Sequence, residues 1–216
     1  MKKKQKKLGS DEITVGVILL LGILAILGII YLPSPLEEEN EFESEYNGYE
    51  FRMTQQGFWA IELSTIYGDE YIPFRNHPSE VDSIPYGNVV DGFNIVNGNQ
   101  GEFRLGISPE YSESGLTTIA GIEIVKVTSH VFGLQSSAGV TTEVEETNVT
   151  EEIAEGSDEV YNCSQASEEI YIVELRQGEE QRLTTNGTCT IIESPDGEGL
   201  IEGANLFVYL ILGIIE

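Results

Sequence analysis

The stretch TCTIIESPDGEGLIEGANLFVYLILGII, residues 188–215, decides the fold that the sequence predicts. Its first part, up to Ser194, is rich in Thr and Ile and indicates a strand. Pro195 and Asp196 then supply the proline and the capping carboxylate that are typical of a helix start. From Leu206 to Ile215 this predicted helix is apolar on almost all sides. Because about ten apolar residues are too few to span a bilayer, we expect a helix buried in a core.

An interaction role is the alternative for the same helix. In that case its apolar surface docks on a protein partner in the envelope or dips into lipid. The residues that would make these contacts are Leu206, Phe207, Leu210 and Ile214.

A second stretch, RLGISPEYSESGL at residues 104–116, has the same order of features. In both, an apolar strand leads through Ser-Pro and an acidic residue into Gly-Leu and an apolar segment. The spacing of Leu116, Ile119, Ile124 and Val127 favours a helix over residues 114–131. The many Thr, Ile and Val residues also permit a strand over residues 122–132, so both readings stay open.

The remaining apolar segments indicate an antiparallel sheet. Alternating side chains predict a meander of three strands, and the loop at 97–101 predicts a hairpin between strands at 92–96 and 102–107. Two further strands, at 169–176 and 181–194, flank a tight turn. The predicted fold class is α+β, with an N-terminal transmembrane helix followed by an extracytoplasmic domain of antiparallel sheet with one or two packed helices.

The N-terminal region indicates a membrane anchor. Residues 13–32, ITVGVILLLGILAILGIIYL, carry no charge and have the length of a spanning helix. Five lysines precede them, which places the N-terminus in the cytoplasm and the rest outside the cell membrane. A cleaved secretory signal and a pilin-like leader are the alternatives. The predicted parts are a basic tail (1–12), the span (13–32), an acidic linker (33–45), a β-rich part (46–142), an acidic loop (143–159) and a disulfide-bonded ββα part (160–216).

The charge of the chain limits its partners. The formal net charge is −26, and only six basic residues follow Ile13. A nucleic acid needs a cationic surface, so we do not expect it as a partner. Cations or basic proteins suit this composition better.

The two cysteines, Cys163 and Cys189, both lie beyond the predicted span, in the oxidising compartment, and predict a disulfide. Two reduced, buried thiols are the alternative. Asn148, Asn162 and Asn186 match the N-glycosylation acceptor pattern, which predicts a glycoprotein if any of the three is modified.

The sequence holds no phosphate-binding loop, zinc-protease motif or nucleophile elbow, so we expect no catalytic residue, cofactor or metal. The nearest approach to a site is RNHPSEV, residues 75–81, where His77 and Glu80 are candidates for a base or ligand and its partner. The structural alternative is a corner in which Pro78 begins a short helical turn.

The chain resembles a group of uncharacterised archaeal single-pass membrane-anchored proteins. The residues that carry the resemblance are YNGYEF (46–51), IPFRNHPSEVDSIP (72–85) and the ending from Thr188, together with the lysine-rich start and single span. The resemblance implies an extracytoplasmic α+β domain in an archaeal envelope and implies no activity.

Three functional hypotheses follow. The first is a non-catalytic, membrane-anchored extracytoplasmic protein that binds or assembles partners in the cell envelope. The second is a pilin-like filament subunit, and the third is an envelope hydrolase that uses carboxylates.

Overall fold

The computed structural model describes residues 43–108, 115–141 and 159–216. The predicted basic tail and membrane span, residues 1–32, lie outside this part, as does most of the predicted acidic loop. Among the described residues, no helix is both long enough and apolar enough to cross a membrane. The described fold therefore departs from the predicted class, which placed a transmembrane helix ahead of the sheet.

The first part of the fold is the predicted antiparallel meander with one strand more than the three expected, because residues 43–46, assigned mostly to the acidic linker, form a further strand. Its strands follow one another in the sheet in chain order. The loop between the first two is Asn47-Gly48, with φ angles of 49° and 84°. Asn-Gly with both φ angles positive is the favoured two-residue hairpin loop. The strands are β1 (Glu43–Tyr46), β2 (Tyr49–Met53), β3 (Trp59–Thr65) and β4 (Gly68–Phe74).

The second sheet is mixed, and here the prediction of an antiparallel sheet was wrong. Its strand order is β6-β5-β7-β9-β8, and all neighbours are parallel except β8 and β9. The single strand predicted at 181–194 is two strands, β8 and β9, and the predicted tight-turn pairing with 169–176 does not form, because the neighbour of β7 is β9, which runs parallel to it. Strand β7 is buried on both faces, which is typical of a central parallel strand. The strands are β5 (Glu102–Ile107), β6 (Gln135–Val140), β7 (Ile170–Gln177), β8 (Arg182–Asn186) and β9 (Cys189–Ser194).

The described residues contain four α-helices rather than the one or two expected. Residues 92–96, predicted as a strand, belong to a helix that Asn88 caps and that buries Val89, Phe93 and Val96 at helical spacing. As predicted, a helix follows each of the two strands, α4 after β5 and α5 after β9; the connection at 109–114 lies outside the described residues. The helices are α2 (Pro78–Val81), α3 (Val89–Gly98), α4 (Gly115–His130) and α5 (Gly197–Ile211), and a 3-10 turn, η2, spans Cys163–Gln165.

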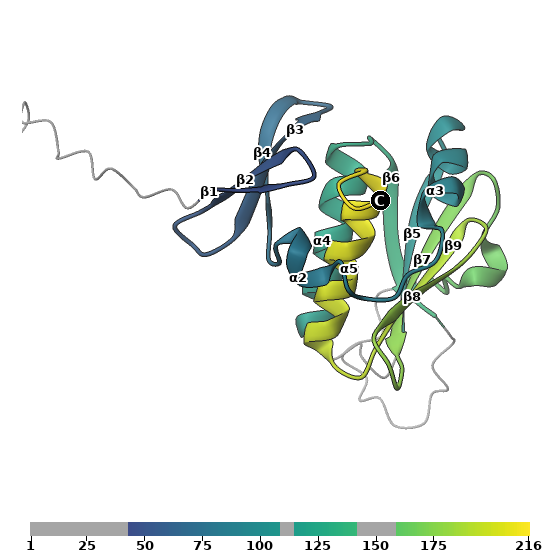
Figure 1. Ribbon diagram of the computed structural model, residues 1–216. Helices are drawn as coiled ribbons and strands as arrows, with labels where there is room; N and C mark the ends of the chain where they lie inside the picture. The colour runs from purple at the N-terminus through teal and green to yellow at the C-terminus, as the bar shows by residue number, and fades with distance from the viewer. Residues whose placement is uncertain (1–42, 109–114, 142–158) are drawn as a thin grey trace, which may run out of the picture. The chain divides into compact units, whose positions relative to one another are not determined.

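Helices α4 and α5 lie between the two sheets (Figure 1). On one side of α5, the Tyr209 ring packs 5.0 Å from Phe74 of the meander, centroid to centroid. On the other side, Phe207 packs against Phe103 and Tyr171 of the mixed sheet at 6.3 and 6.0 Å. This position explains why the helix is apolar all round, and it confirms the prediction of a buried core helix.

The mixed sheet takes strands from both sides of the predicted acidic loop, since β5 and β6 precede it and β7 to β9 follow it. Residues 41–216 form one compact unit. The four side chains predicted to contact a partner lie inside its core, each at most 3% exposed: Leu206, Phe207, Leu210 and Ile214.

Candidate functional site

The candidate pair His77 and Glu80 forms the start of α2. The His77 Nδ1 accepts a hydrogen bond from the Ser79 backbone N–H at 3.3 Å. In return, Glu80 Oε2 accepts one from the His77 backbone N–H at 2.9 Å. Glu80 therefore binds the main chain rather than the imidazole. This reciprocal cap is the arrangement expected of a structural corner.

The His77 ring itself is 6% exposed and packs among aromatic rings. The centroids of Trp59, Phe51 and Tyr46 lie 4.6, 5.1 and 6.0 Å from its own. Burial lowers the pKa of His77, although the charges of Glu80 and Asp82 oppose the shift. Burial thus disfavours the charged form of the ring, and its Nε2 has no hydrogen-bond partner among the described residues. The other histidine, His130, packs instead against Tyr67.

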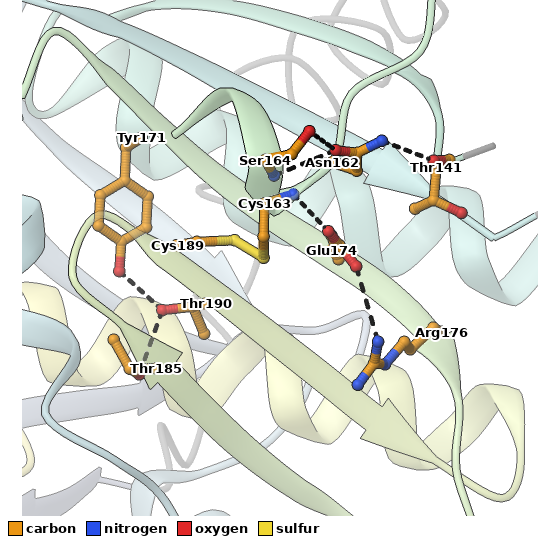
Figure 2. Close-up of a disulfide and its surroundings, with 10 residues drawn as sticks. All are labelled: Thr141, Asn162, Cys163, Ser164, Tyr171, Glu174, Arg176, Thr185, Cys189 and Thr190. Atoms are coloured by element: carbon orange, nitrogen blue, oxygen red, sulfur yellow. Dashed lines mark hydrogen bonds and ion pairs between the residues drawn. A yellow bond between two sulfur atoms is a disulfide. The ribbon is translucent and has the colours of Figure 1, made fainter. Parts of the chain in front are cut away.

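A segment that we call the strap, residues 159–169, crosses the face of the mixed sheet that points away from α4 and α5. The disulfide Cys163–Cys189 fastens it to β9 (Figure 2), which confirms the predicted pairing. Where the strap crosses the sheet, its backbone contacts the backbone of the strands. A Cβ added at Gly106 would lie 2.0 Å from the Tyr161 carbonyl oxygen, so a larger residue there would displace the strap.

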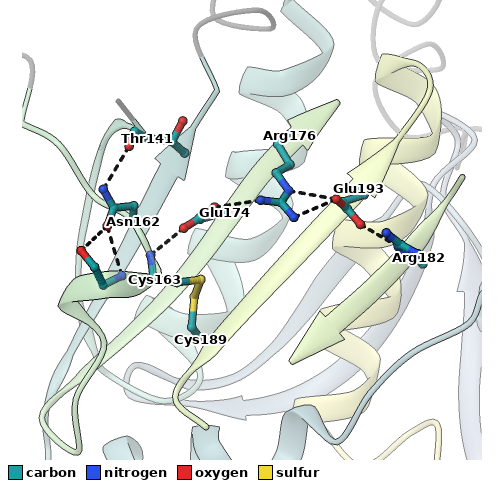
Figure 3. Close-up of polar contacts among 9 residues, drawn as sticks. Thr141, Asn162, Cys163, Glu174, Arg176, Arg182, Cys189 and Glu193 are labelled. Atoms are coloured by element: carbon teal, nitrogen blue, oxygen red, sulfur yellow. Dashed lines mark hydrogen bonds and ion pairs between the residues drawn. A yellow bond between two sulfur atoms is a disulfide. The ribbon is translucent and has the colours of Figure 1, made fainter. Parts of the chain in front are cut away.

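A ladder of charged groups continues from the strap across β7, β9 and β8 (Figure 3). The Cys163 backbone N–H donates to Glu174, and Arg176 Nη1 lies 3.9 Å from the same carboxylate. Arg176 and Arg182 bind Glu193 from opposite sides, at 2.9 and 2.6 Å. Burial alone would raise the pKa of Glu193, but the hydrogen bonds and charges of the two arginines outweigh it and lower the pKa. Each carboxylate thus has a cationic neighbour.

A polar depression of about 390 Å³ lies at the carboxyl ends of β5, β6 and β7, beside this ladder. Ligands of α/β proteins commonly bind at this edge. Its polar groups, however, already bind one another. Asn162 Nδ2 donates to the Thr141 carbonyl at 3.1 Å, and the Ser164 hydroxyl donates to Asn162 Oδ1 at 2.6 Å. A hydrolase that uses carboxyl groups needs one as an acid and one as a base, and both must exchange protons with the substrate. Glu174 suits neither role, because its carboxylate is already bonded.

Metal binding meets a similar obstacle. The donor atoms of Cys163, Glu174 and Cys189 lie within 4.8 Å of one another. The two sulfurs are bonded to each other, which leaves Glu174 as the one donor of the three that is available in this form. Structural zinc sites use four ligands, so the disulfide form does not suit a metal ion.

The most exposed apolar side chains of the described residues gather on and beside α4. Ile122 is 57% exposed on the helix, and Ile66 and Tyr67, in the β3–β4 turn at its end, are 58% and 71% exposed. The two charged residues of α4, Glu123 and Lys126, bind each other, and Lys126 lies one turn after Ile122. We give the name α4 flank to the uncharged residues Thr118, Ile122, Val125, Ser129, Ile66 and Tyr67.

Beside this flank lies an outer strand of the mixed sheet, β6. The Ser129 and Ser136 hydroxyls join α4 to β6 at 3.0 Å. The other outer strands have evident protection against pairing with foreign chains. Strand β4 carries Pro73, which lacks an N–H and whose carbonyl accepts from Lys126. Strand β8 is covered at Leu183, which bonds the Pro85 carbonyl at 2.9 Å. Strand β1 is only four residues long and holds two glutamates.

Strand β6, QSSAGV, has no proline and no charged residue, and its cover is confined to one end. Its outer side is bonded at one end, where the Val140 N–H donates to Glu159 and the Val140 carbonyl accepts from Tyr161. Because backbone groups alternate sides along a strand, those of Ser136 and Ala138 point the same way as those of Val140. Within the described residues, no strand pairs with them on that side.

The sequence contained a signal for this surface that our predictions did not use. Residues 131–142, VFGLQSSAGVTT, carry no charge in a chain with 37 acidic residues. The predicted partner contacts were placed on α5 instead, because its apolar content is higher.

The three glycosylation patterns lie in different surroundings. Asn148 is outside the described residues. Asn162 is part of the strap, where its side chain binds Thr141 and Ser164. Asn186 is exposed at the end of β8. An oligosaccharide at Asn162 would have to displace these two bonds, so Asn186 is the better acceptor of the two described.

Comparisons with known proteins do not identify the site. No family model matches the chain, and neither a curated protein sequence nor a solved structure matches it. The resemblance to archaeal envelope proteins therefore stays a prediction, and the functional argument rests on the chain's own geometry.

Proposed function

We propose that the described domain is a non-catalytic module that binds or assembles a protein partner outside the cytoplasm, and that the partner covers the α4 flank. The observation that carries this proposal is the exposure of Ile66, Tyr67 and Ile122 together on an otherwise acidic chain. A clustered group of exposed apolar side chains is typical of an interaction surface, whereas scattered ones need no explanation.

Two further features support the proposal. The disulfide between Cys163 and Cys189 suits an oxidising compartment, in keeping with a domain that works in the cell envelope. His77 and Glu174 are the side chains best suited to catalysis. Both are held by structural bonds and packing rather than presented to a substrate.

Site-specific photo-crosslinking in the native host tests the proposal. The photoreactive amino acid p-benzoylphenylalanine replaces Ile122 in one variant and Thr184, an exposed residue of β8, in a control variant. We expect a discrete protein adduct from position 122 and none from position 184. Equal labelling at both positions, or no adduct at position 122 in correctly disulfide-bonded protein, would contradict the proposal.

A further inference from the structure

We infer that the partner on the α4 flank is a second copy of this chain, paired antiparallel through β6 so that the two mixed sheets become one. The inference rests on the proposed function and names its partner. It is carried by three properties of the described residues: the unpaired backbone groups of β6, the distribution of charge, and the position of the α4 flank beside the strand.

The backbone groups determine how two copies would pair. The outward groups of Ser136 and Ala138 are unpaired among the described residues, while those of Val140 already bind Glu159 and Tyr161. If two β6 strands pair antiparallel, only one register lets Ser136 and Ala138 of each copy both form hydrogen bonds with the other copy. In that register Ser136 of one copy faces Ala138 of the other, and Ser137 faces its own equivalent on the two-fold axis. A register centred on Ser136 or on Ala138 leaves one of these residues without its partner.

Charge explains why two copies would meet here. At a net charge of −26, contact between identical surfaces generally places carboxylates opposite one another. Strand register puts Glu45, Glu50 and Glu62 on the face of the meander that points away from the helices, and two such faces would repel. Strand β6 contains no charged side chain, and the partly exposed Lys126 of α4 is paired with the buried Glu123. Apart from Glu159 at the Val140 end, this side of the domain can therefore approach a copy of itself at a lower cost.

The α4 flank supplies the apolar part of the contact. A two-fold axis through Ser137 brings the α4 helices of the two copies to the same side of the joined sheet, next to each other. Val125, one turn before the Ser129 that bonds Ser136, then lies beside its equivalent near the axis, and Ile122 extends the apolar contact by a further turn. Strand pairing gives orientation, and burial of these side chains gives most of the affinity. The strap limits the pairing to residues 135–139, because Glu159 and Tyr161 occupy the edge at Val140.

Cysteine trapping tests the register directly. In the full-length chain, Ser137→Cys places two thiols across the axis at a non-hydrogen-bonded position, where Cα atoms are about 4.5 Å apart and a disulfide fits. We expect mild oxidation to give a covalent dimer, seen on a non-reducing gel. The control Thr184→Cys, on exposed β8, should stay monomeric. A peptide map should show Cys163–Cys189 intact in both variants.

Sedimentation of the full-length chain measures the same association without a cross-link. We expect Ala138→Pro to raise the dimer dissociation constant about tenfold, since it removes an outward N–H that no bond among the described residues uses. Ile122→Lys should raise it independently by placing two charges together. If the wild-type chain sediments as a monomer and Ser137→Cys gives no covalent dimer, the inference is wrong. An adduct from position 122 with a different protein would then preserve the proposed function, whereas no adduct would remove both.

Discussion

Helices α4 and α5 follow the same strand-to-corner motif, and both are poor in charge, yet they differ in what covers them. Helix α5 has the meander on one side and the mixed sheet on the other, so nearly all its side chains are buried. Helix α4 lies at the side of the same layer, and one of its sides faces solvent at Ile122. An apolar helix in a sequence therefore predicts burial only where the topology supplies a neighbour for each side.

Truncating an apolar side chain on each helix tests this difference most strongly. Phe207→Ala on α5 should lower the free energy of unfolding by about 3–5 kcal/mol, because it leaves a cavity between helix and sheet. Ile122→Ala on α4 should change it by less than about 0.5 kcal/mol, since that side chain is already in water. Urea denaturation followed by circular dichroism measures both. Similar losses for the two variants would mean that α4 is as enclosed as α5.

The comparison extends to the opposite face of the mixed sheet, where a disulfide holds the strap in place. Replacing Cys163 and Cys189 together by Ala should cost about 3.5 kcal/mol of stability, the chain-entropy value for a loop of this size. Hydrogen exchange should show loss of protection in the strap first, with α5 less affected. Unchanged exchange at Tyr161 and Glu174 would show that the glycine-mediated crossing alone holds the strap.

These two results separate what the sequence predicts from what it does not. The start of α5 could be predicted because Pro195 and the capping Asp196 act locally. The disulfide could be predicted because the chain has only two cysteines. The insertion of β9 between β7 and β8 could not, because parallel pairing depends on partners distant in sequence. The α4 flank escaped prediction for the same reason: the sequence shows apolar side chains but not which of them lack a neighbour.

We expect a smaller effect on stability from the protonation of His77. Aromatic rings exclude solvent from His77, whereas His130 lies at the exposed end of α4. Burial lowers the folded-state pKa of His77, so the unfolded chain takes up the proton first as the pH falls. Its contribution to stability is full above a pH of about 6.5, the unfolded value, and declines below it towards the folded pKa. His77→Asn, which can still cap α2, should flatten this slope in urea titrations between pH 5 and pH 7 (roughly the range over which histidine titrates).

The smallest effect on stability, and the one most specific to function, is expected from a charge on the open side of α4. Ile122→Glu should change the free energy of unfolding by less than about 0.5 kcal/mol, because the side chain is 57% exposed. It should nevertheless weaken partner binding, since a carboxylate would then enter an uncharged contact. Thr184→Glu, on β8, adds the same charge to a surface that we do not propose as an interface, and it should bind as the wild type does. Pull-down from native extracts, with each variant at matched concentration, measures the difference. Equal recovery with the two variants would show that α4 exposes its apolar side without binding anything there, and the contrast with α5 would then concern packing alone.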